Sequence, residues 1–445
     1  MNRFPAVAAA ALCALSLVAP AGAEPPTRFT LAEAVSLAAA KNPGVTAAQM
    51  RTLAARARVG QSRAALLPSL TGQATTTERT FNLYALGISL PVAPGSKPYP
   101  ALQGPVYDTE ARLKLSQPLL DLAAWRKLRA SQLGVLGARA DLGVTAESAA
   151  QGAALAYLRA VRADAVARAR DEDLALARAL QTLAEAQLSA GTSPAIDVTR
   201  ARAQVVSSQG ALLIARNQRE RTRIDLARAL GMDASAQPEP ADTLGAELGD
   251  SDAPHDAGPA VAFAIEHRSE LRGEQARLAK AQADRSALSW ERLPRVDASA
   301  DWGRSGQHYG DGIGTYAYVL AVTLPLLDGF KREGKLAEQG AIVRESQVRA
   351  KDVSDQVVAE VRNALLDLAS GTEQQAIATE RLNLATEEVA QATERFTNGV
   401  AGNIEVINAQ SSLVRARDAD IDARFAVASA RVALARAAGV ARNIH

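Results

Sequence analysis

Cysteine and aromatic residues are scarce in this sequence, and both shortages narrow the choice of fold. The only cysteine among 445 residues is Cys13. It lies within residues 1–23, where Arg3 precedes a short apolar run and small residues at 21–23, the pattern of a secretory signal peptide. We expect an exported mature chain with no disulfide, thiolate metal ligand or lipid anchor. Aromatic residues make up only 4% of the chain, which favours long alanine-rich helices over a thick aromatic core.

An excess of charge of one sign is also missing. The 50 Lys and Arg residues nearly balance the 48 Asp and Glu residues, whereas a nucleic-acid-binding surface needs a basic face or stripe. After the signal, no stretch reaches the ~18 consecutive apolar residues of a membrane-spanning helix. We therefore expect no nucleic-acid partner, and a protein that either stays in the periplasm or crosses a membrane as strands.

Residues for enzyme chemistry are equally sparse. The glycine-rich run at 310–314 lies between two predicted strands, so it is expected to be a hairpin loop and not a phosphate cradle. No Gly-x-Ser-x-Gly motif occurs. The four histidines lie far apart and lack metal-ligand spacing: His255, His267, His308 and His445. We expect no catalytic residue, no metal site, no cofactor and no enzyme activity.

The chain contains two copies of one unit. Residues 188–231 align without gaps on residues 396–439, and Gly191 matches Gly399 at an offset of 208 positions. A Pro-Leu-Leu-Asp motif also occurs in both copies. Internal repeats of this kind decide the fold. The expected organisation is a signal peptide at 1–23, a first repeat at 24–231, an acidic linker at 232–259 and a second repeat at 260–445.

Each repeat is predicted to run helix, two strands, long helix, tight turn, long helix. Residues 122–188 contain no proline and few turn signals, which predicts one helix of roughly 100 Å. Turn residues around Gly191 and Gly399 predict the reversal into a second long helix. The linker 232–259 has seven Asp or Glu and no Lys or Arg, so we expect a solvated connection. The proline-rich residues 81–106, which only the first repeat has, predict a long loop.

Four segments alternate between apolar and polar residues with a period of two. Such alternation over ~10 residues, with aromatic residues near the ends, is typical of membrane β-barrel strands that face lipid on one side and a wet lumen on the other. Four strands cannot close a barrel, and open edges are not tolerated in lipid, so we expect three copies to pool about 12 strands. The alternative is two hairpins of a soluble sheet. The segments are residues 69–80, 107–117, 295–303 and 315–324.

The last helix is predicted to touch two neighbouring helices. Two seams lie about 200° apart around it, one of mixed apolar residues and one of alanine at three-four spacing. Helices with seams on opposite sides can stand side by side and close into a hollow cylinder, and alanine allows close approach. The alternative is an ordinary coiled-coil bundle with alanine as filler. The seams are Val414, Ile421, Phe425, Ala428, Val432 and Ala435, and Ala416, Ala419, Ala423, Ala426, Ala430, Ala433 and Ala437.

Short motifs follow one another in a set order along the chain: Leu-Ala-Glu-Ala at 31–34, Asn-Pro at 42–43, Leu-Pro at 67–68, Gln-Pro-Leu-Leu-Asp at 117–121 and Leu-Pro-Leu-Leu-Asp-Gly at 324–329. With these motifs the chain resembles the TolC-like outer-membrane efflux proteins from about residue 31 to residue 439. The resemblance implies an α+β membrane protein. In it, a trimeric β-barrel with four strands per chain continues as a long α-helical barrel, and each chain is built from two internal repeats. It also implies an outer-membrane location extending into the periplasm, and docking to a periplasmic adaptor protein and an inner-membrane transporter.

The resemblance also implies that the tunnel closes at its periplasmic helix tips. Glu405 matches the position of a first acidic ring, and Asn408 matches that of a second ring, which is uncharged here. Asp197 matches an acidic lock position. The alternative for Asp197 and Glu405 is a pair of acids that stabilise helix N-termini, and both roles are compatible.

At the same helix tips, two residues differ from those that the family resemblance leads us to expect, and two glycines mark the turns. Phe396 stands where the family has a lock tyrosine, and Ala401 replaces a lock arginine, so a gate based on Phe396 packing is an alternative to a polar lock. Gly191 and Gly399 mark the tips at which, by resemblance, an adaptor docks. The alternative for the glycines is simple turn formation.

The expected function is a passive export duct through which a partner pump drives substrates. A first rival is a soluble periplasmic coiled-coil or adaptor-like protein without a membrane barrel. The alternating strands disfavour it, since an adaptor should contain compact all-β modules. A second rival is an uncoupled diffusion porin, which the long helices disfavour.

Overall fold

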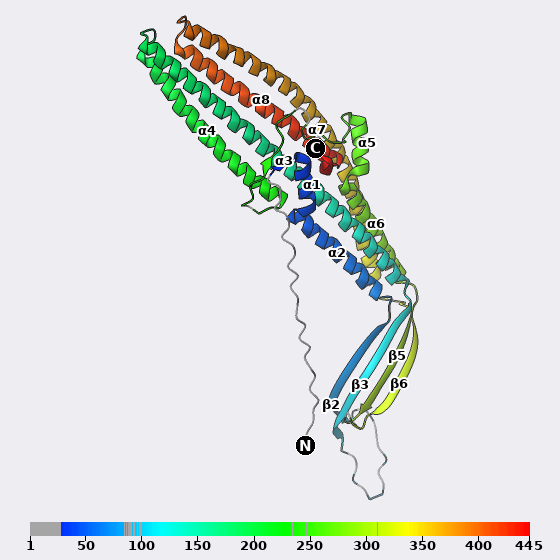
Figure 1. Cartoon of the computed structure of the whole chain (residues 1–445). Coiled ribbons are helices and arrows are strands. Elements are labelled where there is room, and N and C mark those ends of the chain that lie inside the picture. Colours follow the sequence, from blue (N-terminus) through cyan, green and yellow to red (C-terminus); the bar gives the residue numbers. More distant parts are fainter. Residues whose placement is uncertain are drawn as a thin grey trace, which may run out of the picture.

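The computed structural model describes residues 28–445 except 84, 86, 88–90, 92–93, 96, 98–99, 234, 246–247 and 309. The predicted signal peptide and much of the predicted loop 81–106 therefore lie outside the described residues. The molecule is long and thin, with a sheet at one end and two helical hairpins reaching away from it (Figure 1).

One four-stranded antiparallel sheet forms the first end. Its strands are β2 (Ser69–Asn82), β3 (Leu102–Leu120), β5 (Arg295–Gly306) and β6 (Ile313–Thr323), in the order β2-β3-β5-β6. Each strand overlaps one of the four alternating segments, and β3 begins five residues before its segment. The outer strands β2 and β6 each have only one strand neighbour within the described chain.

The strand register gathers most of the large apolar residues of the four strands on one face. Leu70 pairs with Leu115, Leu113 with Trp302, and Trp302 with Tyr316, and directly paired residues share a face. The other face carries the charged partners, among them Lys114 opposite Asp301 and Arg112 in an ion pair with Asp301. No helix of the described chain covers either face, so the apolar face stays exposed: Tyr316, Tyr318, Leu320 and Val322 are each at least 67% accessible.

Two short helix pairs join the sheet to the hairpins. They are α1 (Leu31–Lys41) with α2 (Pro43–Ala64), and α5 (Ala257–His267) with α6 (Ser269–Trp290). A capping box starts α1: Thr30 accepts from the Glu33 amide, and Glu33 accepts from the Thr30 amide. Proline at position 43 then opens α2, because proline fits the first turn of a helix.

Four long helices form the hairpins: α3 (Leu122–Ser189) with α4 (Ala195–Leu230), and α7 (Lys331–Thr397) with α8 (Asn403–Ala438). They lie side by side in the order α4-α3-α8-α7, so α8 touches α3 on one side and α7 on the other. Residues of both predicted α8 seams are buried, for example Val432 and Ala437. None of the helices in the described part of the chain is long and apolar enough to cross a membrane.

The main core lies at the waist, where the short helices meet the long ones. Tyr157 of α3 is fully buried there, with its hydroxyl 2.7 Å from Asp242 Oδ2 and 2.8 Å from the Phe29 carbonyl. Burial raises the pKa of Tyr157 well above its usual value, because the charged phenolate would be desolvated. The residues packed around it include Leu31, Val35, Leu226 and Ile444.

The prediction that 232–259 is only a solvated connection is wrong. Within it, β4 (Glu239–Pro240) pairs in parallel with β1 (Arg28–Phe29), and Asp242 accepts from the Leu31 amide at 2.8 Å. Leu244 and Ala253 are buried. The prediction considered only the acidic composition. It did not consider the apolar residues of this segment that pack on the helices, or that its carboxylates form specific hydrogen bonds.

Candidate functional site at the helix tips

The two hairpin tips lie next to each other at the end of the molecule farthest from the sheet (Figure 1). Gly191 has φ +72° and Gly399 has φ +70°, the left-handed conformation that favours glycine. Both turns close in the same way: the Thr192 amide donates to the Gln187 carbonyl at 2.9 Å, and the Val400 amide donates to the Arg395 carbonyl at 2.9 Å. Both glycines are exposed and have open space around them.

The two tips are bonded to each other. The buried Asn403 side chain donates to the Asp197 carbonyl at 2.9 Å, and the Gln187 side chain donates to the Phe396 carbonyl at 3.0 Å. Phe396 is 2% exposed and packs in a cluster with Val198, Ala392 and Val406. The hairpins are therefore fixed to one another at their ends, as one unit.

Asp197 lies inside this unit, in the first turn of α4. Its carboxylate accepts from the Ser193 hydroxyl at 2.9 Å and lies 3.5 Å from Arg200. The side chain is only 7% exposed. This geometry is that of an acid stabilising a helix N-terminus. Phe396 and Asp197 thus pack between the two hairpins of one chain, and their predicted place in the gate stays a prediction.

Glu405 and Asn408 are accessible instead. Glu405 lies in the first turn of α8 and forms an ion pair with Arg395 at 2.9 Å, and both side chains are about half exposed. Asn408 is exposed one turn further along the helix. Of the four residues predicted for the constriction, these two can meet solvent or a neighbouring chain.

Sequence reasoning missed the polar layer behind the tips. Asp173 of α3 is 3% exposed, and its carboxylate receives Arg170 and Arg417 at 2.8 Å each. Arg170 also binds Asp418 at 2.5 Å, and Gln410, fully buried, donates to the Asp173 carbonyl at 3.4 Å. Burial lowers the pKa of Arg170, but the Asp418 and Asp173 contacts outweigh it and raise the pKa overall. The signal was present, since Arg-Asp-Glu-Asp at 170–173 and Arg-Asp-Ala-Asp at 417–420 repeat one charge pattern.

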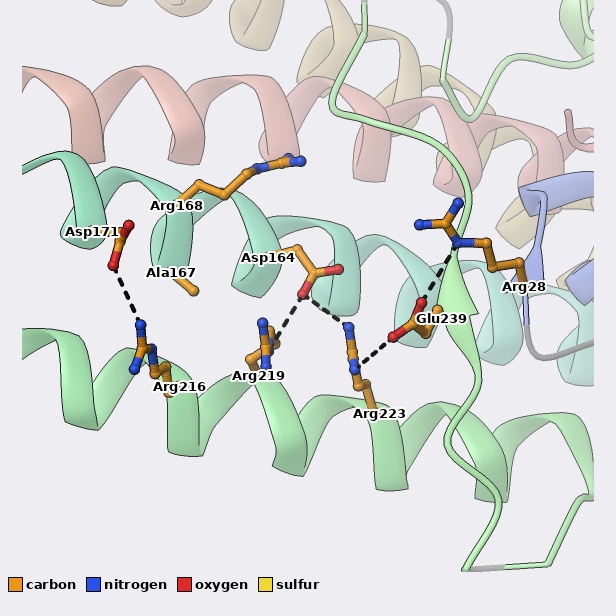
Figure 2. Close-up of a pocket in the computed structure, with 9 residues that line it drawn as sticks. All are labelled: Arg28, Asp164, Ala167, Arg168, Asp171, Arg216, Arg219, Arg223 and Glu239. Atoms are coloured by element: carbon orange, nitrogen blue, oxygen red, sulfur yellow. Dashed lines mark hydrogen bonds and ion pairs between the residues drawn. The ribbon is translucent and has the colours of Figure 1, made fainter.

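A hollow lined by arginines lies at the waist between α3 and α4 (Figure 2). Its volume is about 410 Å³. Arg223 lies 3.6 Å from Asp164 and 3.2 Å from Glu239, and Glu239 lies 3.5 Å from Arg28. Burial raises the pKa of Asp164, although Arg223 and Arg219 oppose the rise. These ion pairs connect β1 and β4 with α3 and α4, so they hold the small β1–β4 sheet against the first hairpin.

No group of His, Cys, Asp and Glu within the described residues could hold a metal ion. The tips and the waist hollow are built from ion pairs and amide hydrogen bonds.

The fold matches solved outer-membrane channels. The Campylobacter jejuni CmeC outer membrane channel is 17% identical, with a TM-score of 0.77 over 92% of this chain and 86% of that chain. The outer membrane protein VceC from Vibrio cholerae is 20% identical, with a TM-score of 0.74 over 92% and 96%. The open state of the Neisseria gonorrhoeae MtrE outer membrane channel is 18% identical, with a TM-score of 0.69 over 92% and 88%.

A family model shows what the chain is. The model described as "Outer membrane efflux protein" matches residues 34–232 and 261–440, one segment on each side of the linker. No curated protein sequence gives a significant match. The chain belongs to the outer membrane efflux protein family, whose members are the outer-membrane channels of efflux.

Proposed function

We propose that three copies of this chain form one channel, in which a 12-stranded β-barrel in the outer membrane continues as a helical tunnel into the periplasm. The observation that carries this proposal is the sheet. All four strands present most of their large apolar residues on one exposed face, and within the described chain β2 and β6 each have one edge without a strand neighbour. Lipid is the environment that such a face suits, and free edges in lipid require strands from further copies.

The two halves of the chain support a duplicated building unit. In α1 and α5 there are 11 residues each, in α2 and α6 22 each, and in α4 and α8 36 each. The two family matches also fall one in each half. A duplicated unit used three times would give the ring six similar hairpins.

The gate in this proposal lies at the tips. Glu405 and Asn408 are accessible on α8, so three copies would bring three carboxylates and three amides together around the axis. Asp197 and Phe396 would hold each copy's two hairpins together from inside, so that the tips move as one body. The Arg395 ion pair would release Glu405 as the gate changes state.

The proposed partners meet the protein at the same end. The turns at Gly191 and Gly399 are exposed and open, which suits docking by a periplasmic adaptor that links the channel to an inner-membrane transporter. The family match removes the soluble coiled-coil alternative.

Ion selectivity in a planar bilayer tests the gate. Glu405→Lys should lower the cation preference of the channel, because three positive charges would replace three negative ones at the narrowest point. Glu266→Lys on α5 makes the same charge change at an exposed position of the waist and should leave selectivity unchanged. Unchanged selectivity in Glu405→Lys would remove Glu405 from the constriction.

A further inference from the structure

The exposed apolar face of the sheet continues past the end of β3 to the start of α3. Leu120 pairs with Val296, and Val296 pairs with Val322, so the apolar face reaches the last residue of β3. The Asp121 side chain then caps α3, and Trp125 lies in the first turn of the helix. Leu120, Val322 and Trp125 are 42, 67 and 61% exposed, so large apolar side chains stay accessible beyond the strands.

The opposite side of α3 borders a hollow on the polar face of the sheet. The hollow has a volume of about 430 Å³ and lies where α3 and α6 meet the strands. Arg295 and Thr323 line it and pair directly with each other. Since they are the strand neighbours of Val296 and Val322, they lie on the opposite face of the sheet. Lys127 of α3 lines the same hollow, so in the proposed channel it faces the lumen.

Helix geometry therefore assigns an outer face to α3. Successive residues of an α-helix are about 100° apart, so Trp125 lies about 200° from Lys127 but only about 40° from Arg129. Arg129 follows Trp125 on the outer face, one turn further from the sheet. Arg129 and Lys127 are both exposed, and neither forms an ion pair within the described residues.

The start of α3 carries an excess of positive charge. Residues 122–140 contain four Lys or Arg and no Asp or Glu, although the whole chain is nearly balanced. A helix N-terminus favours acidic side chains, and α4, α7 and α8 each have one in the first turn. Arg126 is accounted for, because its guanidinium lies 4.1 Å from the centre of the Trp290 ring. Arg129 has no such partner, and an anion outside the chain would supply one.

We propose that Arg129 binds the phosphate of an anionic phospholipid in the periplasmic leaflet of the outer membrane, with Trp125 at the boundary between the acyl chains and the headgroups. This inference rests on the proposed channel and adds a lipid site to its outer wall. From the sheet outward, the outer surface runs from aliphatic strand residues to Trp125 and then to Arg129. A membrane has the same order: hydrocarbon, interface, charged headgroups.

The chemistry of both side chains fits this occupant. The indole N–H of Trp125 has no hydrogen-bond partner in the part of the chain that the structure describes, and an apolar ring with a free donor suits a membrane interface. Arginine binds phosphate through two parallel hydrogen bonds. Because α3 packs between α2 and α6, its outer face lies away from the chain edges at which further copies would join (Figure 1).

Lipid binding to the detergent-solubilised protein tests the cation. Native mass spectrometry would count the lipids retained on the intact assembly during titration with phosphatidylglycerol. Arg129→Gln should weaken this binding about fivefold, the effect of one cation at an anionic headgroup. Lys127→Gln is the matched control, because it removes the same charge two residues away on the lumen side, and it should leave phosphatidylglycerol binding unchanged.

Fluorescence quenching tests the position of the tryptophan. In vesicles of phosphatidylglycerol brominated on its acyl chains, part of the tryptophan emission should be quenched. Trp125→Phe should reduce the quenched part of the emission. Trp290→Phe is the control and should not reduce it, because Trp290 borders the lumen hollow.

The outcomes separate the lipid site from the channel. Weaker lipid binding in Arg129→Gln alone, together with less quenching in Trp125→Phe, on a protein of trimeric mass supports the proposal. On a trimer, equal effects of Arg129→Gln and Lys127→Gln, no effect of either, or unchanged quenching in Trp125→Phe overturns the lipid site and leaves the channel.

A soluble headgroup analogue separates a lipid from a free phosphate. Glycerol phosphate at the concentration of the lipid should not displace phosphatidylglycerol, because it lacks the acyl chains that Trp125 and the apolar surface contact. Displacement at equal concentration would show a site for free anions and would overturn the lipid assignment. A monomeric mass would overturn the proposed channel and the lipid site with it.

Discussion

The connections between α1 and α2 and between α5 and α6, here called the first and second joints, have the same backbone arrangement but different side-chain chemistry. Asn42 lies between α1 and α2, next to the last turn of α4. Arg268 lies between α5 and α6, next to the last turn of α8. The Asn42 side chain donates to the Ala229 carbonyl at 3.1 Å. The Arg268 side chain donates to the Ala437 carbonyl at 3.1 Å and the Arg436 carbonyl at 3.2 Å.

The difference lies in what each residue then requires. Asn42 is neutral and also caps α2 by accepting from the Gly44 amide at 2.9 Å. Arg268 is 4% exposed and needs carboxylates, which Glu270 supplies at 3.1 Å and Glu360 at 2.7 Å. A buried charge ties α5, α6, α7 and α8 together but makes the second joint depend on every partner. The same backbone arrangement can therefore be stabilised either by one neutral amide side chain or by a buried arginine with its carboxylate partners.

Removing the charge should have the largest effect on stability. We expect Arg268→Met to lower the free energy of unfolding by about 3–5 kcal/mol, because two carboxylates lose a buried partner. Asn42→Ala should lower it by about 1–2 kcal/mol, the value of a cap and one hydrogen bond. Chemical unfolding of the detergent-solubilised protein measures both. Equal losses at the two joints would contradict the distinction between them.

Acid should weaken the second joint specifically through Glu270. Burial pushes the pKa of Glu270 up, but Arg436 and Arg268 outweigh it and hold the pKa below its usual 4.5. The carboxylate therefore contributes stability above pH 4.5, and this contribution is lost as pH falls through the folded-state pKa.

Glu270→Gln should thus cost about 1–3 kcal/mol at pH 7 and progressively less as the pH falls below 4.5. Unfolding midpoints of wild type and variant across pH 3–7 measure the difference. A difference that stays constant across this range would show that ionisation of Glu270 is irrelevant.

Equivalent substitutions at the two hairpin tips should reduce stability by similar amounts, unlike those at the two joints. Gly191→Ala and Gly399→Ala should each cost about 1–2 kcal/mol, because alanine must adopt the left-handed conformation. Gly402→Ala is the matched control: its φ is −80°, so alanine needs no left-handed conformation there, and a smaller loss than at Gly191 or Gly399 is expected. Unfolding midpoints of the three variants would separate backbone strain from a general sensitivity of the tips.

The smallest stability effect is expected in the sheet loops, where the halves differ in length. Residues 83–101 separate β2 from β3, whereas 307–312 separate β5 from β6. Replacing residues 84–99 with a short glycine linker should change stability by less than about 1 kcal/mol, because closure entropy varies slowly with loop length. If the loop caps the outer mouth, single-channel conductance should rise. Unchanged conductance would make it a plain surface loop.

Periodic features of the molecule could be predicted from the sequence. The period of two in the strands and the absence of proline from α3 are physical requirements of those elements, and both carry through to the structure. The tip glycines also follow from sequence, because a left-handed turn favours glycine.

The parts that could not be predicted depend on contacts between distant segments. β1 and β4 have two residues each, too few for any periodic signal. A buried Arg268 contradicts the rule that arginine is exposed, and only its carboxylate partners explain it. The burial of Phe396 likewise depends on how the two hairpins meet, which no local pattern of the sequence shows.

The central claim is that one chain is a third of a channel. The most direct measurement is the mass of the protein extracted from outer membranes in detergent, by light scattering corrected for bound detergent. A mass of three chains is the predicted result, because four strands per chain close a barrel only when further copies add their strands. A single-chain mass, in protein released without detergent, would contradict the account.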